Sequence, residues 1–227
     1  MKQILTKGIV LGRTDYGEAD RIITLLTPGQ GKLRLMARGV RRAKSKLAGG
    51  IELFSISDIT YMPGKGDIGT LISSRLDKHY GEIVKDINRV QLGYDLIKQL
   101  NKATEDEPEE DYFYLLNAAF EALNNPAVDL ELIKIWFSAQ LLKLSGHTPN
   151  LSTDTEGRKL EADRKYNFDF ENMSFIDHPQ GRFKANHIKS LRLLFSDNPP
   201  HMLAQVQGIG LLLPACGPLL QTMNQSH

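Results

Sequence analysis

The chain has 227 residues, of which 41% are hydrophobic and 24% are charged, values that are ordinary for a globular protein. The length allows one or two domains, and the single cysteine, Cys216, excludes an intramolecular disulfide. The net charge of +1 conceals an asymmetry. Residues 1–80 hold 14 Lys and Arg against 7 Asp and Glu, whereas residues 81–227 hold 14 against 20. A basic front part and an acidic back part suggest two domains with different partners.

The sequence gives no reason to expect a membrane protein or an exported one. The most apolar run, residues 208–220, is too short to cross a bilayer and contains two prolines. The first residues lack the apolar core of a signal peptide. One cysteine in a chain of this length is consistent with a reducing compartment.

Residues 1–80 have the pattern of a small β-barrel, with segments rich in Ile, Leu, Val and Thr between turn sequences such as Pro28-Gly29. Five strands, with a short helix or loop between the third and fourth, match the OB-fold, a barrel that binds oligonucleotides across one face. An SH3-like barrel is the alternative. We expect strands at residues 4–13, 20–27, 32–38, 53–62 and 68–76, and the short helix or loop at residues 45–51.

The most informative stretch runs from Gly31 to Lys46 and holds seven basic residues and no acidic one. Its first half alternates, which places Leu33 and Leu35 on one side of a strand and basic residues on the other. Each Lys or Arg that neutralises a phosphate releases a counterion, so the pattern favours nucleic-acid binding over a solvated strand face with a charged loop. The candidate contacts are Arg13, Lys32, Arg34, Arg38, Arg41, Arg42, Lys44 and Lys46.

Aromatic residues, which stack on the bases of single strands, are few in the predicted barrel. Only Tyr16 falls in a predicted loop, and both a stacking role and a structural role are open for it. We therefore expect phosphate contacts to outweigh base readout, with weak sequence preference.

After residue 80 the apolar period becomes helical, which predicts a second, mostly helical domain at residues 81–227 after a barrel domain at residues 1–80. The fold class is thus α+β with two domains. An acidic segment, residues 104–111, precedes the second helix. We expect helices near residues 83–101, 112–123, 129–146, 186–195 and 201–213, and an aromatic hairpin at residues 166–175.

The sequence contains no strong catalytic or cofactor motif. Asp15, Glu18 and Asp20 cluster near a predicted turn and could bind a divalent metal, which leaves a metal-dependent nuclease as one alternative. An OB-fold RNA-binding factor is another. Cys216 lies in an apolar run and is interpreted as a packing residue. We expect no enzyme activity, no cofactor, no metal and no small-molecule substrate.

An ordered series of short motifs resembles the RecO family of bacterial recombination mediators. Most of the series lies in the first 80 residues, and a weaker match lies at residues 144–151. The motifs are Lys7-Gly8-Ile9-Val10-Leu11, Asp15-Tyr16-Gly17-Glu18-Ala19-Asp20-Arg21-Ile22, Gly31-Lys32, Ala37-Arg38-Gly39-Val40-Arg41, Lys44-Ser45-Lys46-Leu47-Ala48 and Gly69-Thr70-Leu71.

The resemblance implies a protein of the bacterial cytoplasm, at the nucleoid, with an N-terminal OB-fold and a helical C-terminal domain. It implies binding to single- and double-stranded DNA, strand annealing, and RecA loading together with RecR and the single-strand-binding protein. The helical domain would receive the acidic, apolar-ended tail of the single-strand-binding protein, and Lys184, Lys189 and Arg192 are candidates for the edge of that site.

The chain departs from the family pattern in one respect. Many members of the family carry a four-cysteine zinc site, and its first cysteine pair would fall on Thr153-Asp154-Thr155-Glu156-Gly157 in this sequence. Neither position of that pair supplies a thiolate, so we expect the zinc site to be lost.

Overall fold

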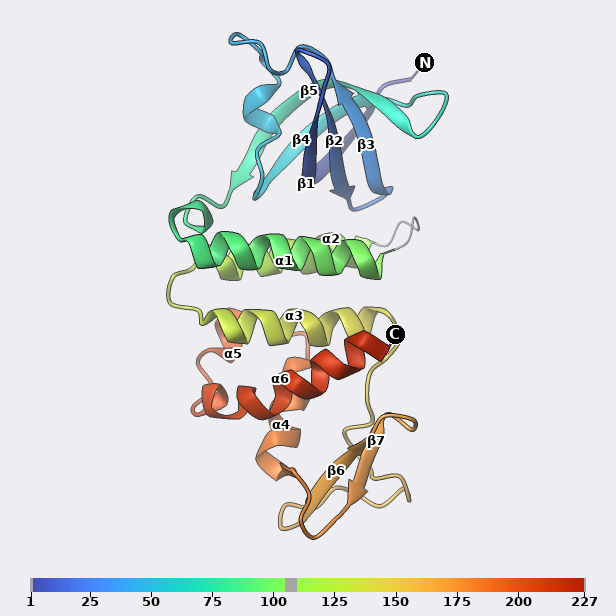
Figure 1. Ribbon diagram of the computed structural model, residues 1–227, viewed down its shortest axis with the longest axis vertical. Helices are drawn as coiled ribbons and strands as arrows, with labels where there is room; N and C mark the ends of the chain where they lie inside the picture. The colour runs from blue at the N-terminus through green and yellow to red at the C-terminus, as the bar shows by residue number, and fades with distance from the viewer. Residues whose placement is uncertain (1, 105–109, 227) are drawn as a thin grey trace. The chain divides into compact units, whose positions relative to one another are not determined.

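Five strands close into a barrel in the computed structural model, which describes residues 2–104 and 110–226 (Figure 1). Their order is β1-β2-β3-β5-β4, and β1 pairs with β4 to close the barrel. Only β3 and β5 run parallel. This topology confirms the OB-fold and excludes the SH3-like alternative. The strands are β1 (Ile4–Tyr16), β2 (Asp20–Thr27), β3 (Gly31–Ala37), β4 (Ser55–Met62) and β5 (Ile68–His79).

The apolar alternation of the strands builds the barrel core. Ile23 and Leu25 of β2, Leu35 of β3 and Ile59 of β4 are all at most 1% exposed. The β4–β5 register shifts between Ile56 and Ser57 and again between Thr60 and Tyr61. Such shifts bend strands, which a closed five-stranded barrel requires.

The two helices that follow the barrel, α1 (Ile87–Ala103) and α2 (Glu110–Leu123), belong to the same compact unit, Met1–Asn124. Phe54, just before β4, joins them to the barrel: its ring centroid lies 5.5 Å from that of Tyr94 and 5.4 Å from that of Phe120.

The compact division of the chain therefore falls after Asn124, whereas the change of periodicity placed it after residue 80. Periodicity shows where helices begin but not what they pack against. Residues 105–109, the middle of the predicted acidic segment, lie outside the described residues.

The second unit, Asn125–His227, combines helices with a three-stranded antiparallel sheet of order β7-β6-β8. Asp129 begins α3 as a helix cap, accepting hydrogen bonds from two backbone N–H groups. The helix α3 is buried on most sides, because apolar residues occur nearly all round it. The elements are α3 (Leu130–Leu144), β6 (Lys165–Asp169), β7 (Ser174–Asp177), β8 (Phe183–Lys184), α4 (Ala185–Leu194), α5 (Pro200–Leu203) and α6 (Ile209–Ser226).

The prediction of a last helix ending near Pro214 is wrong. A short α5 ends at Leu203, and α6 begins at Ile209 and continues through both Pro214 and Pro218. Proline removes one helical hydrogen bond, but α6 buries an apolar side against α3 and α4, and this packing outweighs the lost bonds. Among the described residues, no helix is long and apolar enough to cross a membrane.

Candidate nucleic-acid interface

The outward side of β1, β2 and β3 forms a continuous surface, which we call the outer face. Across β2 and β3, Arg34 pairs with Thr24 and Met36 pairs with Ile22. Leu35, between the two β3 residues, is buried in the core, so the predicted alternation is confirmed. The outer face consists of Thr14, Tyr16, Ile22, Thr24, Arg34 and Met36, all partly or fully exposed.

Residues 39–46, which we call the basic loop, follow β3 directly and are tied to the turn between β1 and β2. Gly39 has a φ of 63°, a conformation that glycine adopts without strain, and its N–H donates to Oδ1 of Asp20 at 2.7 Å. The N–H of Arg41 donates to the carbonyl of Ala19 at 2.9 Å. The beginning of the basic loop is therefore fixed by backbone hydrogen bonds.

Asp15 strengthens the link between the basic loop and the β1–β2 turn through its ion pairs. Its carboxylate accepts a hydrogen bond from Nε of Arg21 at 2.6 Å and lies 3.6 Å from Nη1 of Arg41. The hydrogen bond from Arg21 lowers the pKa of Asp15, and the charge of Arg41 acts in the same direction. The same Arg41 nitrogen donates to the carbonyl of Gly17 at 3.2 Å.

The acidic residues near this turn thus have structural partners, which supports a structural role over metal binding. Asp15 binds two arginines and Asp20 binds the N–H of Gly39, while Glu18 is exposed. Within residues 2–104 and 110–226, no group of three or more His, Cys, Asp or Glu could hold a metal ion.

The inner side of the basic loop and the segment after it are anchored in the barrel. Val40 is 4% exposed and Ile51 1% exposed, and both belong to the core cluster. Ser74 of β5 donates its hydroxyl to the carbonyl of Leu47 at 2.9 Å, and the 3-10 turn η1 (Ala48–Gly50) follows. The predicted short helix or loop is therefore confirmed, and it is held on both sides.

Five of the eight predicted contact residues remain available for a ligand. Each is exposed and, within the part of the chain that the structure describes, makes no side-chain hydrogen bond or ion pair. One of them lies on the outer face, one follows β3, and three lie on the basic loop. They are Arg34, Arg38, Arg42, Lys44 and Lys46.

The other three predicted contacts are occupied within the protein. Arg13 pairs with Ile23, so it lies on the inward side of β1, where its guanidinium binds Glu52 at 2.8 Å. Arg41 holds the turn described above.

Lys32 reaches the C-terminal end of α1. Its Nζ donates to the carbonyl of Asn101 at 3.1 Å and to that of Thr104 at 2.8 Å. The last carbonyls of a helix lack partners within the helix, and the helix dipole favours a cation there. Lys32 therefore caps α1, a role that sequence reasoning missed because its partners lie about 70 residues away in the chain.

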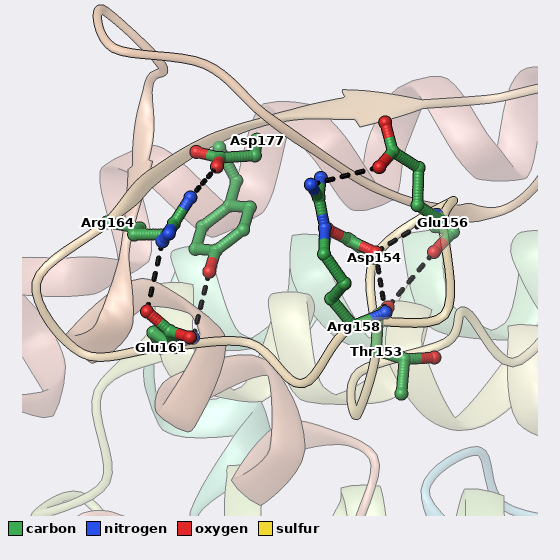
Figure 2. Close-up of polar contacts among 9 residues, drawn as sticks. Thr153, Asp154, Glu156, Arg158, Glu161, Arg164 and Asp177 are labelled. Atoms are coloured by element: carbon green, nitrogen blue, oxygen red, sulfur yellow. Dashed lines mark hydrogen bonds and ion pairs between the residues drawn. The ribbon is translucent and has the colours of Figure 1, made fainter.

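In the second unit, the segment where the first zinc cysteines were expected is a tight turn built on Asp154 (Figure 2). The Asp154 side chain is 4% exposed and accepts hydrogen bonds from the N–H groups of Glu156 at 3.0 Å and Arg158 at 2.9 Å. Nε of Arg158 binds the same carboxylate at 2.9 Å. Burial opposes ionisation, but these hydrogen bonds outweigh it and lower the pKa of Asp154. The turn holds no thiolate, and its buried carboxylate is already committed, so these residues do not fit zinc.

A second polar cluster lies beside that turn. Arg164 binds Asp177 of β7 and also Oε2 of Glu161, 3.0 Å from its Nε (Figure 2). The hydroxyl of Tyr166 accepts the N–H of Glu161 at 2.8 Å. Ion pairs and a buried tyrosine therefore connect the irregular segment to the small sheet. Sequence reasoning missed these contacts and predicted only an aromatic hairpin at residues 166–175.

The second unit also has a cavity of about 650 Å³ between the small sheet and α6. Phe170, which is 43% exposed, and Phe183 line one side, and prolines of α6 line the other. Arg182 places a cation at the wall. The remaining lining residues are Asn167, Phe168, Pro214, Ala215, Pro218, Leu219 and Thr222.

The predicted edge residues for a bound peptide do not line this cavity. Ile188, which lies next to Lys189 on α4, is 2% exposed and belongs to the interior. Arg192 donates two hydrogen bonds to the carbonyl of Leu151, at 2.9 and 2.6 Å. Lys184 and Lys189 are exposed, but neither of them lines the cavity.

Two family models match the chain. The model described as "Recombination protein O N terminal" matches residues 1–79, and the one described as "Recombination protein O C terminal" matches residues 95–197. Together they cover the barrel, the second half of α1, all of α2, and the second unit as far as the end of α4.

Several curated bacterial proteins with the name "DNA repair protein RecO" are similar to the chain. The relative from Desulfatibacillum aliphaticivorans is 32% identical over 154 residues, covering 66% of this chain and 60% of the relative. The relative from Streptomyces avermitilis is 35% identical over 153 residues, covering 64% and 62%. The relative from Dehalococcoides mccartyi strain CBDB1 is 35% identical over 166 residues, covering 71% and 64%. The chain therefore spans less than two thirds of the length of these relatives.

Replacement of Asp154 by Ala should lower the melting temperature by about 5 °C, because two partly buried hydrogen bonds to backbone N–H groups are lost. Stability from this turn should persist at neutral pH and be lost as the pH falls through the lowered pKa of Asp154, below about pH 4. Thermal melts at several pH values check both expectations.

The matched control for that variant is Glu156→Ala, which removes an exposed partner of Arg158 and should leave the melting temperature nearly unchanged. A strong chelator should not shift the melt, and elemental analysis should find no stoichiometric zinc. One zinc per chain, or an Asp154→Ala protein as stable as the control, would show that this turn is held in another way.

Proposed function

Because the chain belongs to the recombination protein O family, we propose that it is a DNA-binding mediator of recombinational repair. In this proposal it binds single- and double-stranded DNA, promotes strand annealing, and assists RecA loading together with RecR and the single-strand-binding protein. The role places it in the bacterial cytoplasm, at the nucleoid.

The observation that carries the proposal is the set of five available cations on and beside the outer face. Each is exposed and makes no ion pair within the described part of the chain, although carboxylates lie nearby. Those carboxylates instead fix the basic loop, so the remaining positive charges face solvent in a defined arrangement. A row of uncompensated cations on a rigid element suits the phosphates of a nucleic acid.

We assign the DNA contacts to residues 1–80 and the protein contacts to residues 81–227. The arrangement supports binding rather than cleavage, since Asp15 and Asp20 already have partners. Incubation of labelled DNA with magnesium or manganese tests the nuclease alternative directly, because a nuclease would shorten the strand. A strong preference for RNA over DNA of the same sequence would favour the RNA-binding alternative, since only RNA offers the 2′-hydroxyl.

The cavity of the second unit is our candidate site for the tail of the single-strand-binding protein. Such a tail is acidic with an apolar end, and the cavity combines exposed aromatic surface with the cation Arg182. An apolar anchor in a pocket beside a charge partner is a usual arrangement for a short peptide.

Salt titration of DNA binding tests the main proposal. The logarithm of the binding constant should fall linearly with the logarithm of the salt concentration, with a slope of roughly −3 to −3.5 if four or five of the available cations each contact a phosphate of a single strand. Replacing Arg42 and Lys44 together by Ala should make the slope shallower by about 1.4, whatever the base sequence. Arg41 is kept in this variant because it holds the loop.

The matched control replaces Lys98 and Lys102, two exposed lysines of α1, and should leave both affinity and slope nearly unchanged. Neither double variant should change the melting temperature much, since all four side chains are exposed. Equal slopes for the loop variant and the wild type would remove the basic loop from the binding site.

Titration of an acidic peptide with an apolar C-terminus into the full chain tests the partner site, with a micromolar Kd expected. Phe170→Ala should weaken binding about tenfold, because this side chain lines the cavity. Ile176→Ala is the control, since Ile176 is similarly exposed, at 42%, but does not line the cavity. If both variants bind the peptide as the wild type does, the tail binds elsewhere.

A further inference from the structure

Tyr16 differs from every other aromatic residue in the first 80 positions. Phe54, Tyr61 and Tyr80 are at most 3% exposed, whereas Tyr16 is 56% exposed. Within residues 2–104 and 110–226, the Tyr16 side chain makes no hydrogen bond and no ring contact. Packing therefore does not account for an aromatic ring at this position.

The backbone that carries Tyr16 is fixed on both sides. Tyr16 is the last residue of β1 and pairs with Asp20 across the hairpin. The residue before it, Asp15, binds Arg21, and the carbonyl of the residue after it accepts the hydrogen bond from Arg41. An exposed ring on a fixed backbone is preorganised for a ligand, because little conformational freedom is lost on binding.

The surroundings of Tyr16 favour a base over a phosphate. Glu18 and Asp20 lie close to it in the chain and form no ion pair within the described residues, so their charges repel phosphates. The available arginines lie on and just beyond β3, two strands away across the outer face, which corresponds to roughly 10 Å. The outer face between them carries Thr14, Ile22 and Thr24, none of which is charged.

We propose that Tyr16 is a base-stacking residue, which receives a base of a single strand while the neighbouring phosphates bind the arginines of β3 and the basic loop. This inference rests on the proposed function, that the barrel binds DNA. Stacking requires an unpaired base, so Tyr16 gives a preference for single strands over duplex. Any base can stack on the ring, so the contact adds affinity without sequence readout.

The test compares the full chain with its Tyr16→Leu and Tyr16→Phe variants. Each is titrated with an oligothymidylate and with an abasic oligonucleotide of equal phosphate number. Tyr16→Leu should bind the oligothymidylate about tenfold more weakly, with an unchanged salt slope, and should bind the abasic strand like the wild type. Tyr16→Phe should retain wild-type affinity for both.

The control is Tyr114→Leu, which changes another exposed tyrosine, 53% exposed on α2, and should bind both strands like the wild type. Tyr16→Trp gives a second measurement: its indole fluorescence, corrected for that of Trp136, should be quenched by the oligothymidylate and not by the abasic strand.

Equal losses on both strands, or no loss on either, would overturn the stacking role while leaving phosphate binding by the barrel intact. No salt-dependent binding by the wild-type chain would overturn the proposed function and this inference with it.

Discussion

The surface proposed to bind DNA depends on the contacts that fix the positively charged basic loop against the barrel. Exposed ion pairs such as Asp15 with Arg41 contribute little to stability, because solvent screens them. Burial of an aliphatic side chain such as Val40 or Ile51 contributes roughly 1.5–3 kcal/mol. Apolar anchoring in the barrel therefore supplies most of the stability of this segment. The ion pairs and backbone hydrogen bonds to the β1–β2 turn then set its direction.

Apolar residues stabilise the segment and ion pairs orient it, which explains why acidic and basic motifs occur together near the start of the chain. The carboxylates of Asp15 and Asp20 neutralise or position the part of the basic stretch that lies against the protein. The cations farther along the loop are left uncompensated. A loop that is ordered before DNA arrives loses less conformational entropy on binding than a mobile one. The same contacts also fix the backbone beneath Tyr16.

The barrel was predictable from the sequence because its signals are local. Strand alternation, turn residues and the basic run gave five strands and the exposed position of Arg34. The roles of Arg13 and Lys32 were not predictable, for two different physical reasons. A shift in the β1–β2 register between Val10 and Gly12 reverses the alternation and turns Arg13 inward to Glu52. Lys32 caps a helix end that is distant in sequence, and no local pattern reports such a contact.

The second unit shows the same limit. Helix periods were visible, but the continuation of α6 through two prolines depends on packing against α3 and α4. The sequence shows that the cysteines are absent. It does not show that Asp154 and Arg158 organise the turn in their place. The cavity beside α6 is lined by three separate segments, residues 167–170, 182–183 and 214–222, so its lining could not be assembled from any one stretch.

Photo-crosslinking tests the central claim, that the outer face and the basic loop hold the DNA. An oligonucleotide with a photoreactive base would be cross-linked to the full chain, and the modified peptides would be mapped by mass spectrometry. If the outer face and the basic loop bind the DNA, cross-links should fall within residues 12–46 and should be lost at high salt. Cross-links confined to residues 125–227 would contradict it and would assign DNA binding to the other unit.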